Sequence, residues 1–444
     1  MGPRREPRNR PTSADRSLLS PSGTTPIGPP VSDPRDASRP GSPDSRPLTV
    51  VIGCDTFAPD VNGAAKFAER LAAGLAQRGH EVHVVAPSAD GWSGTRVETH
   101  EGQRIIVHRL YSWRWYPHDW LRFAMPWRIR QNSARILDEV KPDVVHFQSH
   151  IIVGRGLGIE AAKRGIRIVG TNHFMPENML EFTLLPKAVQ AKAVAMAWRA
   201  ARRTFGRAEA VTTPTRKAAQ FLEKYTGLRG VHAISCGIDA DNYTPDFAAR
   251  AGDSILFVGR VTGEKHIDVL LRAVALLDPA LDAKLEIVGG GDQMRNLQQL
   301  AATLGIADRV RFTGYVSDAE LKEAYTRATV FAMPSIAELQ SIATMEAMAS
   351  ALPVVAADAM ALPHLVHDGE NGYLFAPGSA EALADRLTAV LTADQEDLEA
   401  MKRASLQIVA AHDINRTIST FESLYRGEPV ADPASDAASA PAAT

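Results

Sequence analysis

Two carboxylates lie eight positions apart in the stretch SIAELQSIATMEAMASALP, residues 335–353. The first, Glu338, comes just before an expected helix, where free backbone N–H groups favour an anion. The second, Glu346, falls about 40° from Ile342 around that helix, at the edge of an apolar stripe. A carboxylate there is costly unless something bonds it. The pair therefore either binds a polar ligand or is a helix-start glutamate followed by a solvated one.

A basic pair follows another expected strand. Arg260 and Lys265 lie five positions apart, on either side of Gly263 at the start of a helix. Two cations and a helix N-terminus suit a phosphate or diphosphate, and each charge-assisted bond contributes about 1.5–3 kcal/mol. The alternative is a pair of solvated surface cations. His173 likewise ends a strand and precedes a loop with a proline, where it is either a functional or a structural histidine.

Several familiar motifs are absent from the sequence. GGGD, residues 289–292, lacks the spacing of a dinucleotide fingerprint and predicts a tight turn or a close backbone approach to a ligand. The chain has no GxxxxGKS/T phosphate loop and no GxSxG nucleophile motif. DAD, residues 239–241, fits a metal-binding pattern, but its place in an expected linker favours a turn or helix cap. No Cys or His cluster has zinc spacing, so we expect neither a metal nor another cofactor.

The composition bounds the class of protein. At 444 residues, with 45% hydrophobic and 23% charged residues, the chain is long enough for two domains with cores of their own. The formal net charge of −2 argues against a nucleic-acid partner held by bulk charge. Cys54 and Cys236 are the only cysteines, which fits a reducing, cytoplasmic compartment. No run of about 18 apolar residues predicts a membrane-spanning helix.

The two ends differ from the middle. Residues 1–47 hold 11 of the 28 prolines, mixed with Ser, Arg and Gly, and residues 428–444 are also poor in large apolar side chains. Neither segment can bury enough surface to fold, so we expect two disordered tails. The first lacks the apolar segment of a signal peptide.

The body alternates strand and helix from Leu48 onward. Apolar segments such as LTVVIGC, EVHVVAP and DVVHF are separated by helical patterns, and after a pause near residues 236–243 the series restarts with SILFVGR, KLEIVGGGD and VFAMP. This order predicts parallel sheets covered by helices on both faces. We therefore expect an α/β protein of two doubly wound domains, with a seam near residue 240 and a ligand cleft between them.

With these residues in place, the chain resembles a retaining glycosyltransferase of family 4, with the GT-B fold of two Rossmann-like domains facing across a cleft. The motifs are GR…EK at 259–265, VGGGD at 288–292, FTGYVS at 312–317 and above all the E-x7-E unit from Glu338 to Glu346, followed by VHDGENGYLF. NGAAKFAERLAAGLAQRGHEVHVVAP and TNHF extend the resemblance over about residues 48–427. It resembles actinobacterial mannosyl- and glucosyltransferases that act on lipid acceptors.

The resemblance implies a layout of domains. An N-terminal acceptor-binding domain would cover residues 48–238, and a C-terminal domain that binds the nucleotide sugar would cover 239–412. A helix over 413–427 would return to the N-terminal domain.

The resemblance also implies roles for the polar residues. Glu346 would hold the ribose hydroxyls of a nucleotide sugar, and Glu338 the hydroxyls of the transferred sugar. Arg260 and Lys265 would take the leaving diphosphate in place of a metal ion, and His173 would contact the donor sugar near its anomeric carbon. Such enzymes retain the anomeric configuration by front-face attack without a protein nucleophile. Backbone groups would complete donor binding: Gly63 near the phosphates, Gly290 in the glycine-rich turn, Val316 at the base, and Gln340, Ser341 and Ile342 at the helix start.

Two positions depart from the family pattern. The E-x7-E unit commonly begins E-P-F-G, whereas this chain has ELQS over residues 338–341. Ser341 replaces a glycine that lies against the sugar, so the identity of the sugar stays open. Ala351 also stands where glycine is common, which we interpret as a packing change.

The acceptor side rests on two surface features. Residues 111–127 hold four of the six tryptophans, with Arg114 and Arg122 among them, and residues 186–207 form a basic helical stretch. Such a surface suits an anionic membrane, so we expect a lipid acceptor and a peripheral place on the inner face of the plasma membrane. Ordinary core aromatics and a solvated basic helix face are the alternative.

Three functions compete on these observations. The first is hexose transfer from a GDP-mannose or UDP-glucose type donor to a glycolipid or lipid precursor, or to a soluble small molecule. The second is a sugar-nucleotide epimerase of the same fold, which needs acid/base carboxylates in the N-terminal domain that no pattern indicates. The third is a non-catalytic sugar-binding module, which is expected to have lost Glu338 or the basic pair. Both are present, so we expect the first function.

Overall fold

The computed structural model describes residues 46–60, 62–114, 122–175, 187–248 and 252–430. The elements below all belong to one compact unit that begins at Pro47. The two predicted tails, 1–47 and 428–444, fall almost wholly outside the described residues, as does the middle of the tryptophan-rich segment.

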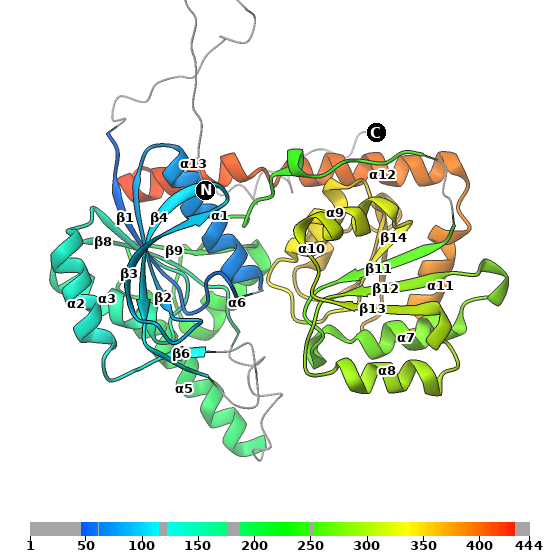
Figure 1. Ribbon diagram of the computed structural model, residues 1–444, viewed down its shortest axis with the longest axis horizontal. Helices are drawn as coiled ribbons and strands as arrows, with labels where there is room; N and C mark the ends of the chain where they lie inside the picture. Colours follow the sequence, from blue (N-terminus) through cyan, green and yellow to red (C-terminus); the bar gives the residue numbers. More distant parts are fainter. Residues whose placement is uncertain (1–45, 61, 115–121, 176–186, 249–251, 431–444) are drawn as a thin grey trace, which may run out of the picture. The chain divides into compact units, whose positions relative to one another are not determined.

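An eight-stranded sheet forms the first half of the unit (Figure 1). Its centre is apolar on both faces: Val50 and Ile52 of the first strand pack into one core cluster, and Val51 between them packs into the other. The strand order is β10-β9-β8-β7-β1-β2-β4-β3, and every neighbouring pair is parallel except β3 and β4. The strands are β1 (Thr49–Gly53), β2 (Glu81–Pro87), β3 (Gly94–His100), β4 (Gln103–Leu110), β7 (Val144–Phe147), β8 (Arg167–Thr171), β9 (Ala210–Thr213) and β10 (His232–Ala233).

Helices cover both faces of this sheet, which we call, with its helices, the N-terminal domain. One face carries α1 (Gly63–Gln77), and the other carries α2, α3, α5 and α6. The bounds of the latter are α2 (Ile129–Val140), α3 (Val153–Lys163), α5 (Lys187–Phe205) and α6 (Arg216–Thr226), and a short ribbon joins β5 (Ser112–Arg114) to β6 (Arg122–Ala124).

A six-stranded, all-parallel sheet forms the second half, which we call the C-terminal domain. Its order is β13-β12-β11-β14-β15-β16, so the direction of winding reverses between β11 and β14, where ligands bind in doubly wound sheets. The strands are β11 (Ser254–Val258), β12 (Lys284–Val288), β13 (Val310–Gly314), β14 (Val330–Met333), β15 (Val354–Ala357) and β16 (Gly372–Phe375). The helices are α7 (Ile267–Leu276), α8 (Met294–Thr303), α9 (Asp318–Arg327), α10 (Ile342–Ala349), α11 (Ala380–Leu391) and α12 (Gln395–Ala410).

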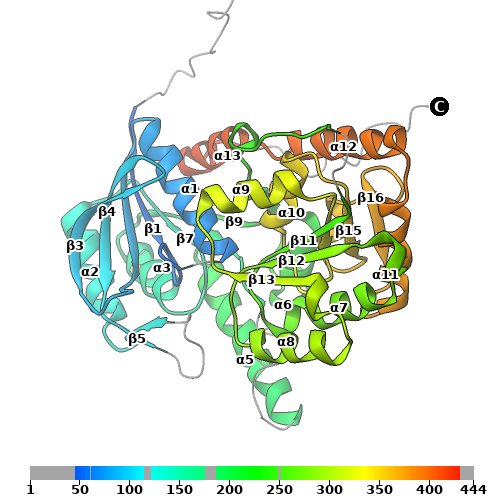
Figure 2. The ribbon, with the colours of Figure 1, turned by 45° about the vertical axis from the view of Figure 1, so that its right-hand side comes forward.

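The chain passes between the two domains twice. The first crossing runs through residues 235–238 and the second through residues 411–414. The two are bonded together, since the Ile238 N–H donates to the His412 carbonyl at 2.7 Å and the Ile414 N–H donates to the Ile238 carbonyl at 3.0 Å. After the second crossing, α13 (Ile414–Arg426) packs against α1 and β8 of the N-terminal domain (Figure 2).

One edge strand of the first sheet departs from the predicted parallel order. β3 pairs with β4 in antiparallel register, from Gly94 opposite Arg109 to His100 opposite Gln103. Its side chains are mostly exposed, so the strand lacks the apolar run that marks the buried strands.

Candidate functional site

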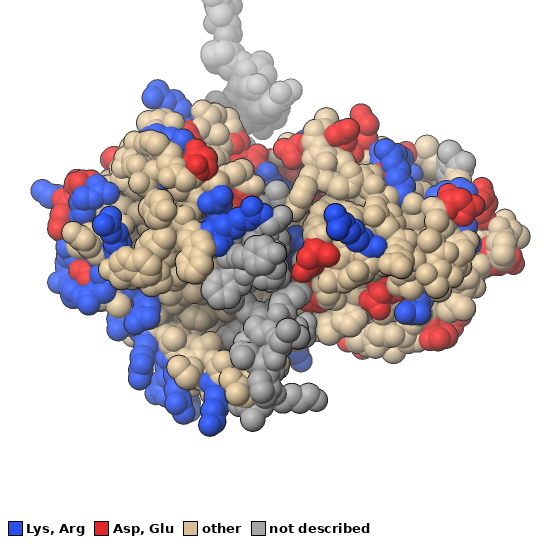
Figure 3. All heavy atoms as spheres, turned by 60° about the horizontal axis from the view of Figure 1, so that its bottom comes forward, with Lys and Arg blue, Asp and Glu red and all other residues tan. Residues whose placement is uncertain are grey.

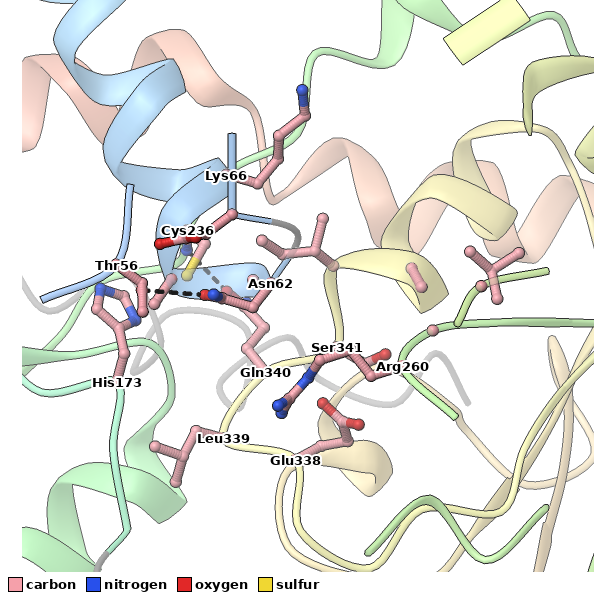
Figure 4. Close-up of a pocket in the computed structure, with 18 of the residues that line it drawn as sticks. Thr56, Asn62, Lys66, His173, Cys236, Arg260, Glu338, Leu339, Gln340 and Ser341 are labelled. Carbon is pink, nitrogen blue, oxygen red and sulfur yellow. Dashed lines mark hydrogen bonds between the residues drawn. The ribbon is translucent and has the colours of Figure 1, made fainter. Parts of the chain in front are cut away.

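A cavity of about 1040 Å³ opens where the carboxyl ends of the two sheets face one another (Figure 4). The N-terminal domain supplies the segments that follow β1, β7 and β8, and the C-terminal domain supplies those that follow β11, β12, β13 and β14. All residues that the sequence analysis selected line this cavity except Gly290. Gly290 instead lies against the Tyr315 ring, which an added Cβ would meet at 2.6 Å, and its neighbour Gly289 lines the cavity.

Glu338 and Lys265 are ion-paired inside the cavity. Glu338 lies in the loop after β14, and Lys265 ends the short 3-10 turn Gly263–Lys265 after β11. The Lys265 ammonium donates to Glu338 Oε1, and both side chains are nearly buried. The structure thus brings the predicted phosphate-binding cation and the predicted sugar-binding carboxylate into direct contact. A ligand that separates them would need to offer an anion to one and hydroxyl groups to the other.

Arg260 stands beside this pair with a carboxylate of its own. Its guanidinium Nη2 lies 3.3 Å from Glu264 Oε1, four residues along the chain, and points toward the Glu338 carboxylate in Figure 4. Glu264 is buried, and its second oxygen, Oε2, has no hydrogen-bond partner within the described structure. Glu264 therefore helps to orient the Arg260 guanidinium at the wall of the cavity.

Glu346 is held by one residue from each domain. Its Oε1 accepts a hydrogen bond from Arg70 Nη2 of α1 at 2.9 Å, and its Oε2 accepts one from the Tyr325 hydroxyl at 3.0 Å. Burial opposes the charge of Arg70, but the Glu346 carboxylate outweighs it and raises the Arg70 pKa. The Tyr243 hydroxyl lies beside the same carboxylate, and burial followed by the Glu346 charge raises the Tyr243 pKa.

His173 lines the wall that the N-terminal domain contributes. Its Nε2 lies 2.8 Å from Gln148 Oε1, and its ring centroid lies 5.0 Å from that of Phe67. Burial lowers the pKa of His173 to about 3, so the imidazole is neutral near pH 7 and its Nε2 donates to the Gln148 carbonyl oxygen.

The start of α10 closes the cavity between Glu338 and Glu346. Ser341 caps the helix: its hydroxyl oxygen accepts from the Thr344 N–H at 3.3 Å and from the Thr344 hydroxyl at 2.8 Å. Ile342 packs into the cores of both domains, and a Cβ added to Gly63 at the start of α1 would meet it at 3.7 Å. Val316 lines the side of the cavity near β13.

Sequence reasoning missed three residues of this site: Arg70, Tyr325 and Glu264. Arg70 and Glu346 are 276 residues apart in the chain, so no local pattern pairs them. Glu264 stood within the quoted GR…EK motif, and its spacing of four from Arg260 was a signal that the sequence offered.

The described residues contain neither a metal-binding cluster nor a membrane-spanning helix. No group of three or more His, Cys, Asp or Glu side chains there is arranged to hold a metal ion. Within the same residues, none of the helices has both the length and the apolar character needed to cross a bilayer.

Comparison with known proteins identifies the family. The model for "Glycosyl transferases group 1" matches residues 249–407, and that for "Glycosyltransferase Family 4" matches residues 61–242. A GDP-mannose-dependent alpha-mannosyltransferase of Mycolicibacterium smegmatis is 30% identical over 338 residues, which cover 74% of this chain and 84% of that protein. A phosphatidyl-myo-inositol mannosyltransferase of Mycobacterium leprae is 35% identical over 192 residues, 40% of this chain and 50% of the relative.

A solved structure of similar fold supports the architecture. The sucrose-phosphate synthase of Thermosynechococcus elongatus superposes with a TM-score of 0.72 at 19% identity, over 85% of this chain and 98% of that one. The two sheets, the crossings between them and the sequence relatives agree on one family. The chain belongs to family 4 of the glycosyltransferases, and it is a hexosyltransferase with the GT-B fold.

Proposed function

We propose that this enzyme moves a hexose from a nucleotide diphosphate sugar, of GDP-mannose or UDP-glucose type, to an acceptor hydroxyl with retention of the anomeric configuration. The observation that carries the proposal is the cluster of Arg260, Lys265 and Glu338 in one cavity. Two cations and one carboxylate side by side suit a substrate that joins a diphosphate to a polyhydroxyl group.

The basic pair would stabilise the leaving diphosphate without a metal ion. As the bond from the anomeric carbon to the diphosphate oxygen breaks, negative charge grows on that oxygen beside Arg260 and Lys265. Glu338, released from Lys265, would accept hydrogen bonds from the hydroxyls of the sugar. The acceptor oxygen would form its new bond on the same face of the sugar, and its proton would pass to the departing diphosphate.

The remaining contacts would orient the nucleotide and the sugar. The Glu346 carboxylate lines the cavity and would accept hydrogen bonds from ribose hydroxyls, and Val316 lies where a base could rest. Gly63 and the backbone of Gln340, Ser341 and Ile342 would approach the phosphates, and Gly289 of the glycine-rich turn lines the same cavity. His173, being neutral, would donate or accept a hydrogen bond near the anomeric carbon without repelling its developing positive charge.

We also propose a lipid acceptor at an anionic membrane. Residues 48–238 contain 26 Lys and Arg against 16 Asp and Glu, whereas residues 239–412 contain 13 against 25. Basic side chains gather on the N-terminal domain in the left part of Figure 3, and Trp113 and Trp127 of that domain are 61% and 74% exposed. Exposed indoles among cations suit a headgroup layer, and the name of the Mycobacterium leprae relative indicates a phosphatidyl-inositol acceptor for that enzyme. We infer a peripheral position on the cytoplasmic face of the plasma membrane.

The test is a donor and acceptor screen. The protein is incubated with GDP-mannose, UDP-glucose and related donors, and release of nucleoside diphosphate and the anomeric configuration of the product are measured. Vesicles containing phosphatidylinositol, neutral vesicles and soluble inositol phosphates serve as acceptors. Transfer to the lipid alone supports the proposal, transfer to the soluble compound alone shows a small-molecule acceptor, and the absence of transfer from every donor would contradict the proposed function.

A further inference from the structure

Gln340 lines the cavity, and its side chain forms hydrogen bonds with the first crossing between the domains. It lies between Leu339 and Ser341 in the loop that carries Glu338, and its side chain is buried. Gln340 Oε1 accepts a hydrogen bond from the Cys236 N–H at 2.7 Å, and Gln340 Nε2 donates to the Ser235 hydroxyl oxygen at 3.0 Å. The Cys236 N–H can only donate, so the orientation of the Gln340 amide is fixed.

Ser235 passes the contact on to the second crossing. Its oxygen accepts from Gln340 and also from the Gly237 N–H at 3.1 Å, so its own proton is available to donate. The acceptor is His412 Nδ1, 2.9 Å away. Burial lowers the pKa of His412 to about 4, so this histidine is neutral and has a ring nitrogen able to accept.

Three segments far apart in the sequence therefore meet at Ser235: the loop 338–341, which carries Glu338, and both crossings between the domains. A further bond, from the Thr417 hydroxyl to the Ser235 carbonyl at 3.1 Å, ties the same residue to α13. The loop is also held by the N-terminal domain, because the Thr215 hydroxyl that caps α6 donates to the Leu339 carbonyl at 3.0 Å.

We propose that Gln340 is a positioning residue that fastens the loop 338–341 to the crossings and so sets where the Glu338 carboxylate stands. Gln340 does not itself need to touch the reacting atoms. Glu338 lies two residues before Gln340, and its carbonyl accepts a hydrogen bond from the Ala361 N–H at 3.2 Å. The backbone of Glu338 is therefore held on one side by the segment that follows β15 and on the other by the contacts of Gln340. The inference rests on the proposed function only in assigning Glu338 to the transferred sugar.

The test compares Gln340→Met with the wild-type protein. Methionine has a similar volume and makes neither hydrogen bond. We expect the turnover of the donor that the wild type uses to fall at least tenfold. The affinity for GDP or UDP, which lack the sugar that Glu338 would contact, should fall by a clearly smaller factor than turnover. Ser235→Ala keeps the Cys236–Gln340 bond and should lose less turnover. Gln298→Met, the same change on an exposed face of α8, should behave as wild type.

A second readout does not depend on activity. Hydrogen–deuterium exchange of the peptide that carries Cys236 should be at least tenfold faster at that amide in Gln340→Met, because its acceptor is gone. Unchanged exchange, or unchanged turnover, would overturn the inference. So would an equal loss of turnover and nucleoside diphosphate affinity, which indicates general damage to the cavity. If the wild type uses no nucleotide sugar, the proposed function fails, and the exchange experiment still decides whether Gln340 fastens the loop.

Discussion

Three pairs of oppositely charged side chains lie in and beside the cavity. Each pair contains at least one residue that the sequence analysis predicted to contact the ligand. Glu338 is paired with Lys265, Glu346 with Arg70, and Arg260 with Glu264. Pairing lowers the cost of burying these charges before a substrate arrives. It also means that substrate must replace existing bonds, so single substitutions should change affinity and turnover in different ways.

The two glutamates should fail differently when their charge is removed. Glu346→Gln keeps the shape but weakens bonds to ribose, which are equal in the ground and transition states, so donor affinity should fall by about 1–3 kcal/mol. Glu338→Gln removes charge beside the sugar, where positive character grows as the bond breaks, so single-turnover rate should fall more than affinity. Calorimetry and rapid quench measure the two quantities. Equal losses of affinity with unchanged rates would refute this division of roles.

The Arg70–Glu346 pair should be visible in stability. Arg70→Met leaves the buried Glu346 carboxylate without its cationic partner, and breaking a buried pair costs about 3–5 kcal/mol. The double variant Arg70→Met/Glu346→Gln removes the unpaired charge and should unfold in urea at a higher concentration than Arg70→Met. If the single and double variants have the same midpoint, the pair contributes little to the free energy of unfolding.

At the scale of elements, the ends of helices are set by local rules that the sequence displays. Asn62, Thr215, Ser317, Ser341 and Ser379 each cap a helix with a side-chain oxygen. The C-terminal end of α2 departs from the usual preference for glycine. Lys141 follows α2 with φ 50° and ψ 56°, a left-handed conformation that favours glycine, while its N–H donates to the Leu137 carbonyl.

Lys141→Gly should therefore stabilise the protein. The lysine is exposed, so the change removes the strain of the left-handed backbone and loses little packing. We expect the free energy of unfolding to rise by about 0.5–1 kcal/mol in urea denaturation. The control is Glu323→Gly, an exposed position inside α9 with ordinary helical geometry, which should lower it by about 1 kcal/mol. Equal effects of the two substitutions would contradict the explanation.

Much of this architecture was predictable because most buried strands are short apolar runs with turns after them. The E-x7-E unit could also be placed, since β14 and α10 both have clear patterns. The antiparallel edge strand β3 could not, because its side chains face water and alternate little. Ala351, expected to be a packing change, has φ 61°, so the glycine common there has a backbone reason that the sequence alone does not reveal.

The whole molecule contains several histidines that are buried in the neutral form. Burial lowers the pKa of each: His146 and His173 to about 3, and His108, His150 and His412 to about 4. In the unfolded chain their pKa is about 6.5, so the unfolded state binds more protons below that pH.

The free energy of unfolding should therefore be highest above about pH 6.5 and fall as the pH drops toward 4. Each such histidine contributes a slope of at most about 1.4 kcal/mol per pH unit. His100 works the other way, since burial alone would lower its pKa but the hydrogen bonds that its ring donates to Glu69 and Glu98 raise it. Melting temperatures between pH 8 and 5 test the trend. In His412→Gln, the free energy of unfolding should depend less steeply on pH, because at most one fewer proton is taken up on unfolding. A melting temperature that is the same at pH 7 and pH 5 would exclude this linkage.

Removal of divalent metals should leave transfer intact. The proposed site supplies Arg260 and Lys265 for the leaving diphosphate, so initial rates in excess EDTA should stay within about twofold of those with magnesium. Arg260→Ala in EDTA should lose most of the activity, as the positive control for dependence on protein cations. Activity lost in EDTA and restored by manganese would instead direct attention to Asp239 and Asp241 as ligands.

The two bonded crossings have a mechanical consequence. Two domains joined by a single segment of chain can rotate and slide relative to each other in several directions. Here two segments cross side by side and are bridged where Ile238 pairs with Asp413, so together they form a hinge. Rotation of one domain about the line through the two crossings is the easiest relative movement. Sliding of one domain past the other would require the hydrogen bonds at both crossings to break together. The width of the cavity then depends mainly on the angle between the two domains. The Arg70–Glu346 ion pair and the Thr215–Leu339 hydrogen bond link the domains away from the hinge and stabilise the closed angle.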